Sequence, residues 1–181
     1  MDEICFKKYL KQALVNESLF VYFAKLHKES INQQPYINWL FVAAYYSALH
    51  YFYAFIICKG KCEAELPRSH MSCKDSLGDL EMAKWSFCSV DSHGKADAVG
   101  EYYVQLYDWS YDVRYVPHKY DRLGEAEIRI TLLALKRIKC VVQNESGYIF
   151  KLAGGEIVLS RSVERDLLRL WAKVGLTDND I

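Results

Sequence analysis

Residues 36–58 read YINWLFVAAYYSALHYFYAFIIC, and this stretch decides the fold that the sequence predicts. It contains neither glycine nor proline, and its clearly polar residues are Asn38, Ser47 and His50. Strands are rarely longer than about ten residues, so an unbroken run of this length predicts a helix. Gly60 suits the position just after the last turn. The stretch is therefore read as one long helix that is apolar on almost every side.

A helix of this kind must be enclosed, either by other helices or by lipid. The run is long enough to span a bilayer, which takes about 20 apolar residues. Five tyrosines disfavour lipid, because a phenol in mid-membrane needs a hydrogen-bond partner that hydrocarbon cannot offer. They are Tyr36, Tyr45, Tyr46, Tyr51 and Tyr53. We therefore predict the central helix of a soluble bundle, with no membrane, whose tyrosine hydroxyls reach the ends or surface of the bundle.

Three further stretches have the apolar spacing of long helices, at residues 2–29, 95–115 and 125–142. A shorter helix is expected at residues 73–87. Four long helices with short links between them predict an all-α fold, an antiparallel up-and-down four-helix bundle. Small residues on the central helix would let a neighbouring backbone come close: Ala43, Ala44, Ser47 and Ala48.

The end of the chain has a different character. Residues 148–159 have the pattern of a small β-hairpin that turns at two adjacent glycines. A last, extra helix is expected to follow and to end near residue 174, just before a glycine. The sequence therefore predicts two parts: a helical bundle at residues 1–145, and a hairpin plus short helix at 146–181 that packs on it.

Two of the predicted helices show an apolar stripe. In the first helix the stripe consists of Ile4, Leu10, Leu14, Leu19, Phe20, Phe23 and Leu26. In the fourth helix it consists of Ile128, Leu132, Leu135 and Ile138. Beside this second stripe lies a basic band: Arg129, Lys136, Arg137 and Lys139. Such bands are usually solvated faces, and the alternative is a contact with phosphate.

Charge and cysteine content limit the classes of function. The 23 basic and 23 acidic residues balance, which excludes a protein-wide basic surface for nucleic acid but not a local basic site. Six cysteines without a secretory signal indicate a reducing cytoplasm and free thiols. Cys58, Cys62, His70 and Cys73 are zinc-ligand types, but their spacing is not that of an established zinc motif, so no metal is expected.

Several short motifs resemble those of HEPN-domain proteins and occur in that family's order. Residues 43–50, AAYYSALH, resemble the signature of the second helix, and residues 16–19, NESL, resemble part of the opening helix. Ser69 and His70 stand where many members have a Ser-His pair after helix two. Residues 112–120, DVRYVPHKY, resemble the end of helix three, where the family places an arginine followed by a histidine or by Asp-Tyr.

This resemblance covers residues 3–144 and implies two kinds of function. Many members are metal-independent RNases, often toxins, and a homodimer brings two copies of their arginine–histidine motif to one cleft. Others are non-catalytic modules that bind a nucleotide or a partner protein, often a nucleotidyltransferase that acts as antitoxin. The resemblance therefore implies no cofactor. It makes Arg114 and His118 the catalytic candidates, and the candidate binding residues are His50, His70 and Tyr120.

The spacing of Arg114 and His118 departs from the active family motif. Three residues separate them, whereas active members have four to six. The match is closer to the Arg-x-x-x-Asp-Tyr form of inactive members, with His118 at the Asp position and Tyr120 just beyond. The structural alternative is that Arg114 pairs with Asp108 or Asp112 while His118 caps the end of a kinked helix.

In the catalytic interpretation, the two residue types have complementary roles. The arginine would hold the scissile phosphate of RNA and stabilise its growing charge. The histidine would take the proton of the 2′-hydroxyl, or protonate the leaving 5′-oxygen, near neutral pH. One histidine cannot easily make both proton transfers, so a homodimer that supplies a second one is attractive.

Two further sets of residues have a core interpretation and a binding interpretation. His50 is expected to be a core histidine bonded to nearby tyrosine hydroxyls, or to bind RNA or nucleotide if it faces the cleft between helices two and three. Four aromatic residues follow helical spacing, which is more typical of a core than of a platform for bases. They are Trp85, Tyr103, Tyr107 and Trp109.

Overall fold

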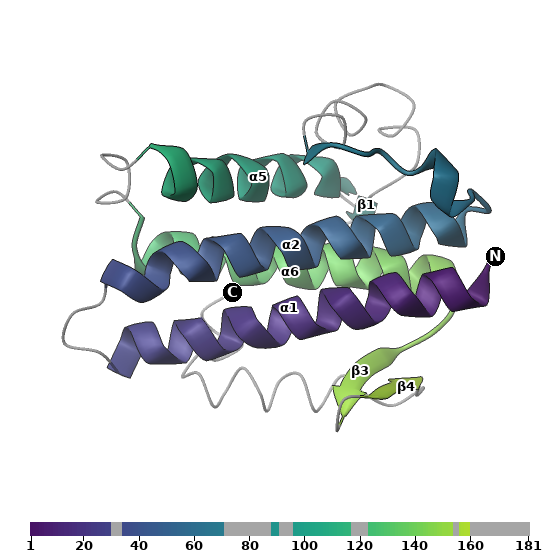
Figure 1. Cartoon of the computed structure of the whole chain (residues 1–181), viewed down its shortest axis with the longest axis horizontal. Helices are drawn as coiled ribbons and strands as arrows, with labels where there is room; N and C mark the ends of the chain where they lie inside the picture. The colour runs from purple at the N-terminus through teal and green to yellow at the C-terminus, as the bar shows by residue number, and fades with distance from the viewer. Residues whose placement is uncertain (30–33, 71–87, 91–95, 117–122, 154–155, 160–181) are drawn as a thin grey trace.

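Four long helices form the body of the protein. The computed structural model describes residues 1–29, 34–70, 88–90, 96–116, 123–153 and 156–159. The helices within them are α1 (Glu3–Glu29), α2 (Gln34–Cys58), α5 (Val99–Tyr115) and α6 (Glu125–Ser146). The chain reverses direction from each of these helices to the next (Figure 1). The predicted helical bundle is thus confirmed, whereas the short helix expected at 73–87 and the last helix lie outside the described residues.

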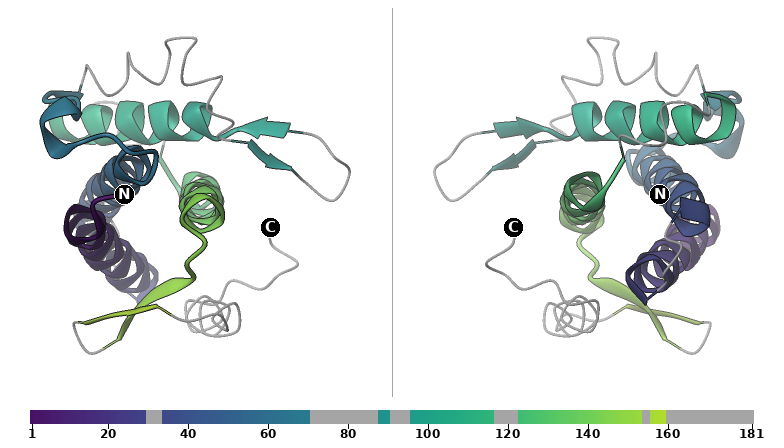
Figure 2. Two further views of the ribbon diagram at one scale, coloured as in Figure 1. Left: turned by 90° about the vertical axis from the view of Figure 1, so that its right-hand side faces the viewer. Right: turned by 90° about the vertical axis from the view of Figure 1, so that its left-hand side faces the viewer.

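The apolar helix α2 occupies the centre of the bundle. It packs against α1, α5 and α6. In Figure 2, α1, α2 and α6 are seen nearly end on, and α5 lies obliquely across one side of them. Within the part of the chain that the structure describes, one helix is long and apolar enough to cross a membrane, Tyr36–Cys58, and 78% of its apolar window is buried in the protein. A core helix of a soluble protein passes the same test of length and composition.

The contact between α1 and α2 is close because small residues line it. Ala44 and Ala48 are fully buried, and the Ser47 hydroxyl donates a hydrogen bond of 2.9 Å to the Ala13 carbonyl of α1. This agrees with the small-residue patch that the sequence shows on α2. The helix ends at Cys58, and Gly60 follows in the left-handed conformation (φ 89°) that glycine adopts without strain.

The buried face of α1 differs from the predicted stripe. Its buried residues are Phe6, Leu10, Ala13, Leu14, Glu17, Phe20 and Ala24. Ile4 is 83% exposed and Leu19 is 42% exposed, so their assignment to the core stripe was wrong. The buried set recurs at intervals of three and four residues and includes Glu17, which hydrophobicity alone would place outside.

The tyrosine hydroxyls of α2 do not all reach the surface, contrary to the prediction. Tyr45 and Tyr51 are fully buried, and their hydroxyls find partners inside the bundle. The Tyr45 hydroxyl lies 3.4 Å from that of Tyr103 in α5, and the Tyr51 hydroxyl donates to the Glu17 carboxylate. A buried phenol needs such a partner, since losing water without one is costly.

A buried ion pair joins α1 to α6. The Lys139 ammonium lies 3.1 Å from both carboxylate oxygens of Glu17. The same carboxylate accepts a hydrogen bond from the Tyr51 hydroxyl. Lys139 is only 4% exposed, so its place in the predicted solvated band was wrong. The predicted α6 stripe, by contrast, is buried as expected: Ile128, Leu132, Leu135 and Ile138.

Short strands flank the helices. A two-stranded antiparallel ribbon of β1 (Cys88–Val90) and β2 (Ala96–Ala98) precedes α5, so this helix begins at Val99 rather than at the predicted residue 95. It ends at Tyr115, as Pro117 predicts, because the residue before a proline disfavours helix. After α6, β3 (Phe150–Ala153) pairs antiparallel with β4 (Glu156–Leu159), and Phe150 packs against the Tyr51 ring at 6.1 Å.

The buried ion pair yields a stability prediction. Lys139→Ala is expected to lower the free energy of unfolding by about 3–5 kcal/mol, because it leaves the buried Glu17 carboxylate without its cation. Urea denaturation followed by circular dichroism measures this change. Lys7→Ala, which removes the exposed partner of Glu3 on α1, is the matched control and should change little.

A double variant separates charge from packing. Glu17→Gln combined with Lys139→Met removes both charges and keeps a carbonyl oxygen for the Tyr51 hydroxyl. It should recover most of the loss seen with Lys139→Ala. A double variant as unstable as the single one would contradict the explanation by an unpaired carboxylate.

Candidate functional site

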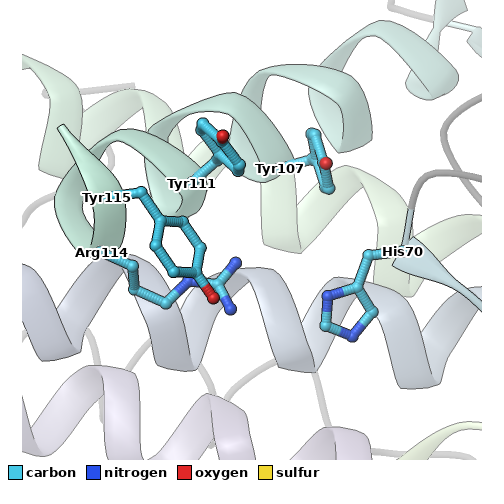
Figure 3. Close-up of a pocket in the computed structure, with 5 residues that line it drawn as sticks. All are labelled: His70, Tyr107, Tyr111, Arg114 and Tyr115. Atoms are coloured by element: carbon cyan, nitrogen blue, oxygen red, sulfur yellow. The ribbon is translucent and has the colours of Figure 1, made fainter.

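A solvent-open pocket of about 290 Å³ lies between α5 and the segment that follows α2. It is lined by His70, Tyr107, Tyr111, Arg114 and Tyr115, which Figure 3 draws as sticks. Four of these residues come from one face of α5, and His70 comes from the other side of the pocket. The pocket therefore unites residues that are far apart in the sequence.

Arg114 is held in position by its own helix. Its Nε donates a hydrogen bond of 2.8 Å to the Ser110 carbonyl, and its guanidinium lies over the Tyr115 ring, 5.2 Å from the ring centre. Neither Asp108 nor Asp112 forms an ion pair with Arg114, although the structure describes all three residues. The structural alternative of such a pair is thus not found. The terminal NH₂ groups stay directed toward the pocket (Figure 3).

His70 contacts two aromatic residues of α2. Its ring packs edge-on against Tyr45 at 5.3 Å and against Tyr46 at 5.5 Å. Partial burial lowers the pKa of His70 below its usual value of 6.5, and the nearby positive charge of Arg114 lowers it further. At neutral pH the imidazole is therefore uncharged, with one nitrogen free of a proton.

The three tyrosines of the pocket follow one another along α5. The Tyr107 and Tyr111 ring centres are 6.3 Å apart, and those of Tyr111 and Tyr115 are 5.0 Å apart. Tyr107 is nearly buried and packs on Tyr45 at 5.6 Å. Tyr111 is 45% exposed and Tyr115 is 62% exposed. We call these three residues the tyrosine ladder; they share a face because side chains four apart in a helix do.

We call residues 59–70 the strap. This segment follows α2 and ends at His70, which packs beside Tyr45 and Tyr46 of α2. The Tyr53 hydroxyl donates a bond of 2.9 Å to the Pro67 carbonyl. Glu63 of the short 3₁₀ turn Glu63–Glu65 accepts hydrogen bonds from Lys8 (2.6 Å) and Tyr9 (2.7 Å) of α1. These two bonds favour the charged carboxylate and hold the pKa of Glu63 at about 2. The strap is therefore anchored to both α1 and α2.

His50 lies apart from this pocket. Its ring stacks on Tyr9 of α1 at 6.1 Å and meets the Tyr53 ring edge-on, also at 6.1 Å. Its buried Nδ1 has no hydrogen-bond partner in the described part of the chain, so the predicted bond to a tyrosine hydroxyl was wrong. Desolvation lowers the pKa of His50 to about 4, which keeps the ring neutral.

Several candidate residues lie outside the described residues. They are His118, Tyr120, Cys73 and Trp85. The proposed pairing of Arg114 with His118 and the role of Tyr120 therefore stay predictions. Four cysteines are free thiols: Cys5, Cys58, Cys62 and Cys140. No group of three or more His, Cys, Asp or Glu side chains that could hold a metal ion occurs in the described ranges.

Sequence reasoning missed two residues of the pocket, Tyr111 and Tyr115. Their signal was the spacing of four residues from Tyr107, which places all three on one helical face. The core interpretation is confirmed for Tyr103, which is buried, and for Trp109, which packs half-buried on Phe41 at 5.4 Å.

Comparison with known proteins identifies no relative of this chain. No family model matches it, and no curated protein or solved structure matches it either. The chemistry of the pocket is therefore inferred from its own residues.

The proximity of Arg114 and His70 yields a titration prediction. Arg114→Gln removes the positive charge that disfavours protonation of His70, so the pKa of His70 should rise while staying below 6.5, because burial, the larger cause, persists. An NMR titration of the histidine ring protons measures the pKa values of His70 and His50 in one experiment. His50 is the internal control, because its lowered pKa arises from desolvation alone. A pKa of His70 that does not change would contradict the proximity.

Proposed function

We propose that this protein is a HEPN-like module that binds RNA or a nucleotide in the Arg114 pocket. One observation carries the proposal: a half-buried guanidinium, with no carboxylate partner in the described part of the chain, lines an open pocket beside aromatic rings. An unpaired cation in such a place favours an anionic ligand, and a planar aromatic wall favours one that carries a base.

A phosphate suits the free edge of Arg114. The Ser110 carbonyl occupies Nε, which leaves the terminal NH₂ groups to donate to two oxygens of one ligand. The Tyr115 ring supports the flat face of the guanidinium, so its direction is set before a ligand arrives. Among the described residues that line the pocket, none is acidic and Arg114 is the cation, which suits a phosphate.

The neutral His70 completes the pocket without adding charge. Its imidazole has one donor and one acceptor nitrogen, which suits a ribose hydroxyl or a base edge. The aromatic contacts with Tyr45 and Tyr46 restrict the ring, so its orientation does not depend on the ligand.

The meeting of two motif positions supports the HEPN-like assignment. His70 follows helix two in the sequence, and Arg114 closes the third long helix, yet both line one pocket. Four long helices packed together are consistent with the helical bundle that the resemblance implies. Within this proposal the protein acts as a cytoplasmic homodimer, and a nucleotidyltransferase-type antitoxin is its candidate partner.

Metal-independent RNA cleavage is the second candidate function, and the neutral imidazole beside Arg114 favours it. A histidine base takes the proton of the 2′-hydroxyl, and the 2′-oxygen attacks phosphorus while the bond to the 5′-oxygen breaks. Arg114 stabilises the charge on the phosphoryl oxygens. A second histidine, His118 or its copy in a homodimer, protonates the leaving oxygen, which yields a 2′,3′-cyclic phosphate and a 5′-hydroxyl.

The binding proposal predicts a specific loss in one variant. Arg114→Gln should weaken the binding of a fluorescein-labelled 12-nucleotide RNA about tenfold or more, because it removes a charged phosphate contact. Fluorescence anisotropy in the presence of EDTA and at fixed salt measures the dissociation constant. Arg129→Gln, the same charge change at an exposed position of α6, is the matched control and should change it less than about twofold. Equal affinity in the wild type and Arg114→Gln would contradict the proposal.

The cleavage candidate predicts a product that simple binding does not give. Incubation of the same RNA with the protein and EDTA should release fragments that end in 2′,3′-cyclic phosphate, which mass spectrometry identifies. Arg114→Ala and His118→Ala should each abolish them. Intact RNA after incubation with a wild-type protein that binds it would exclude cleavage of this RNA and leave the binding module.

A further inference from the structure

The tyrosine ladder presents aromatic surface beyond the part of the Tyr115 ring that supports the Arg114 guanidinium. The exposed fraction rises along α5, from 7% at Tyr107 to 45% at Tyr111 and 62% at Tyr115. The Tyr107 ring packs on Tyr45 in the core. The two outer rings, Tyr111 and Tyr115, therefore continue a row whose first ring is held by the core. Large exposed aromatic residues in a row are unusual for a surface that stays bare.

The helix α2 also carries an exposed aromatic residue, Trp39. Trp39 is 61% exposed and lies seven residues, about two helical turns, before Tyr46, so both share one face of α2. Tyr46 contacts His70 at the edge of the pocket. Because α2 and α5 run in opposite directions, the start of α2 and the end of α5 lie at the same end of the bundle (Figure 1). Exposed aromatic residues from both α2 and α5 therefore occur at this end of the bundle.

The charge beside the ladder indicates what covers it. Arg114 lies over the Tyr115 ring and has no acidic partner in the described residues, which suits a phosphate next to a stacked base. Successive tyrosines are four residues apart and rise by about 6 Å along the helix, so the ladder can receive more than one base. In a duplex the faces of the bases are hidden by their neighbours, whereas unpaired bases can be splayed onto aromatic rings.

We propose that Tyr111 and Tyr115 form a base-stacking platform, with Trp39 at its edge, for at least two unpaired bases of an RNA strand whose phosphate contacts Arg114. This inference rests on the proposed function and specifies its ligand as a single strand longer than one nucleotide. Stacking is tolerant of sequence because every base has a flat π-face, so the platform selects for unpaired bases rather than for a particular sequence.

The test compares aromatic and aliphatic substitutions in the full chain. Tyr111→Leu and Tyr115→Leu should each weaken the binding of the labelled 12-nucleotide single strand by about 5- to 150-fold, the range that one stacked base contributes. Tyr111→Phe and Tyr115→Phe keep the ring and should bind within about twofold of the wild type. Tyr22→Leu, at a 56% exposed tyrosine of α1, is the control for loss of a surface ring. Thermal unfolding verifies that each variant folds.

Two further readouts distinguish stacking from phosphate contact. The salt dependence of the affinity should be unchanged in Tyr111→Leu, whose ring does not support Arg114, whereas Arg114→Gln should reduce its logarithmic slope by about one. The same RNA annealed to its complement, and free AMP, should both bind at least about tenfold more weakly than the single strand.

The outcomes are separable. Loss of binding in Arg114→Gln but not in the leucine variants would leave the proposed function standing and overturn the platform, as would equal affinity for the duplex. A wild type that binds none of these probes would overturn both. Sedimentation gives the last outcome: leucine variants that turn a dimer into a monomer with unchanged RNA affinity would identify this face as a contact between copies and overturn the platform.

Discussion

The enclosure of α2 is the constraint on which the rest of the structure depends. This helix is apolar nearly all round but carries phenol groups, so it must be covered by helices that also supply hydrogen-bond partners. Glu17 meets that need for Tyr51, and Lys139 then compensates the charge of Glu17. Three helices are thus tied together at one buried carboxylate, where any unpaired member would be costly.

The same helix supports residues that line the pocket. Tyr45 is fully buried, yet it contacts His70, Tyr103 and Tyr107, which belong to the strap and to α5. The pocket is therefore built directly on the rigid core rather than on loops alone. Such support fixes the direction of polar side chains before a ligand arrives, which reduces the entropy lost on binding.

A neutral chain can still hold a strongly directed cation. The formal net charge is zero, and Arg114 is the charged residue among the described residues that line the pocket. Its guanidinium is half-buried, where a charge interacts more strongly with a ligand than it does in open water. Burial lowers the pKa of His70, and the positive charge of Arg114 lowers it further.

Local patterns in the sequence were sufficient for the long helices, for the burial of α2 and for the end of α5 before Pro117. These features depend on periodicity and on residues with fixed backbone preferences, which act over a few neighbours. Arg114 was also a candidate from its motif. Only the tertiary structure decided that Lys139 is buried and that Ile4 is exposed.

The composition of the pocket was likewise decided by tertiary structure. Its partner histidine among the described residues is His70, which the strap brings back to α5, and its exposed rings are Tyr111 and Tyr115. The physical reason is that helical period shows which residues share a face but not which helix covers that face. A buried charge or an open ring depends on the element packed against it, and that choice is made by the whole bundle.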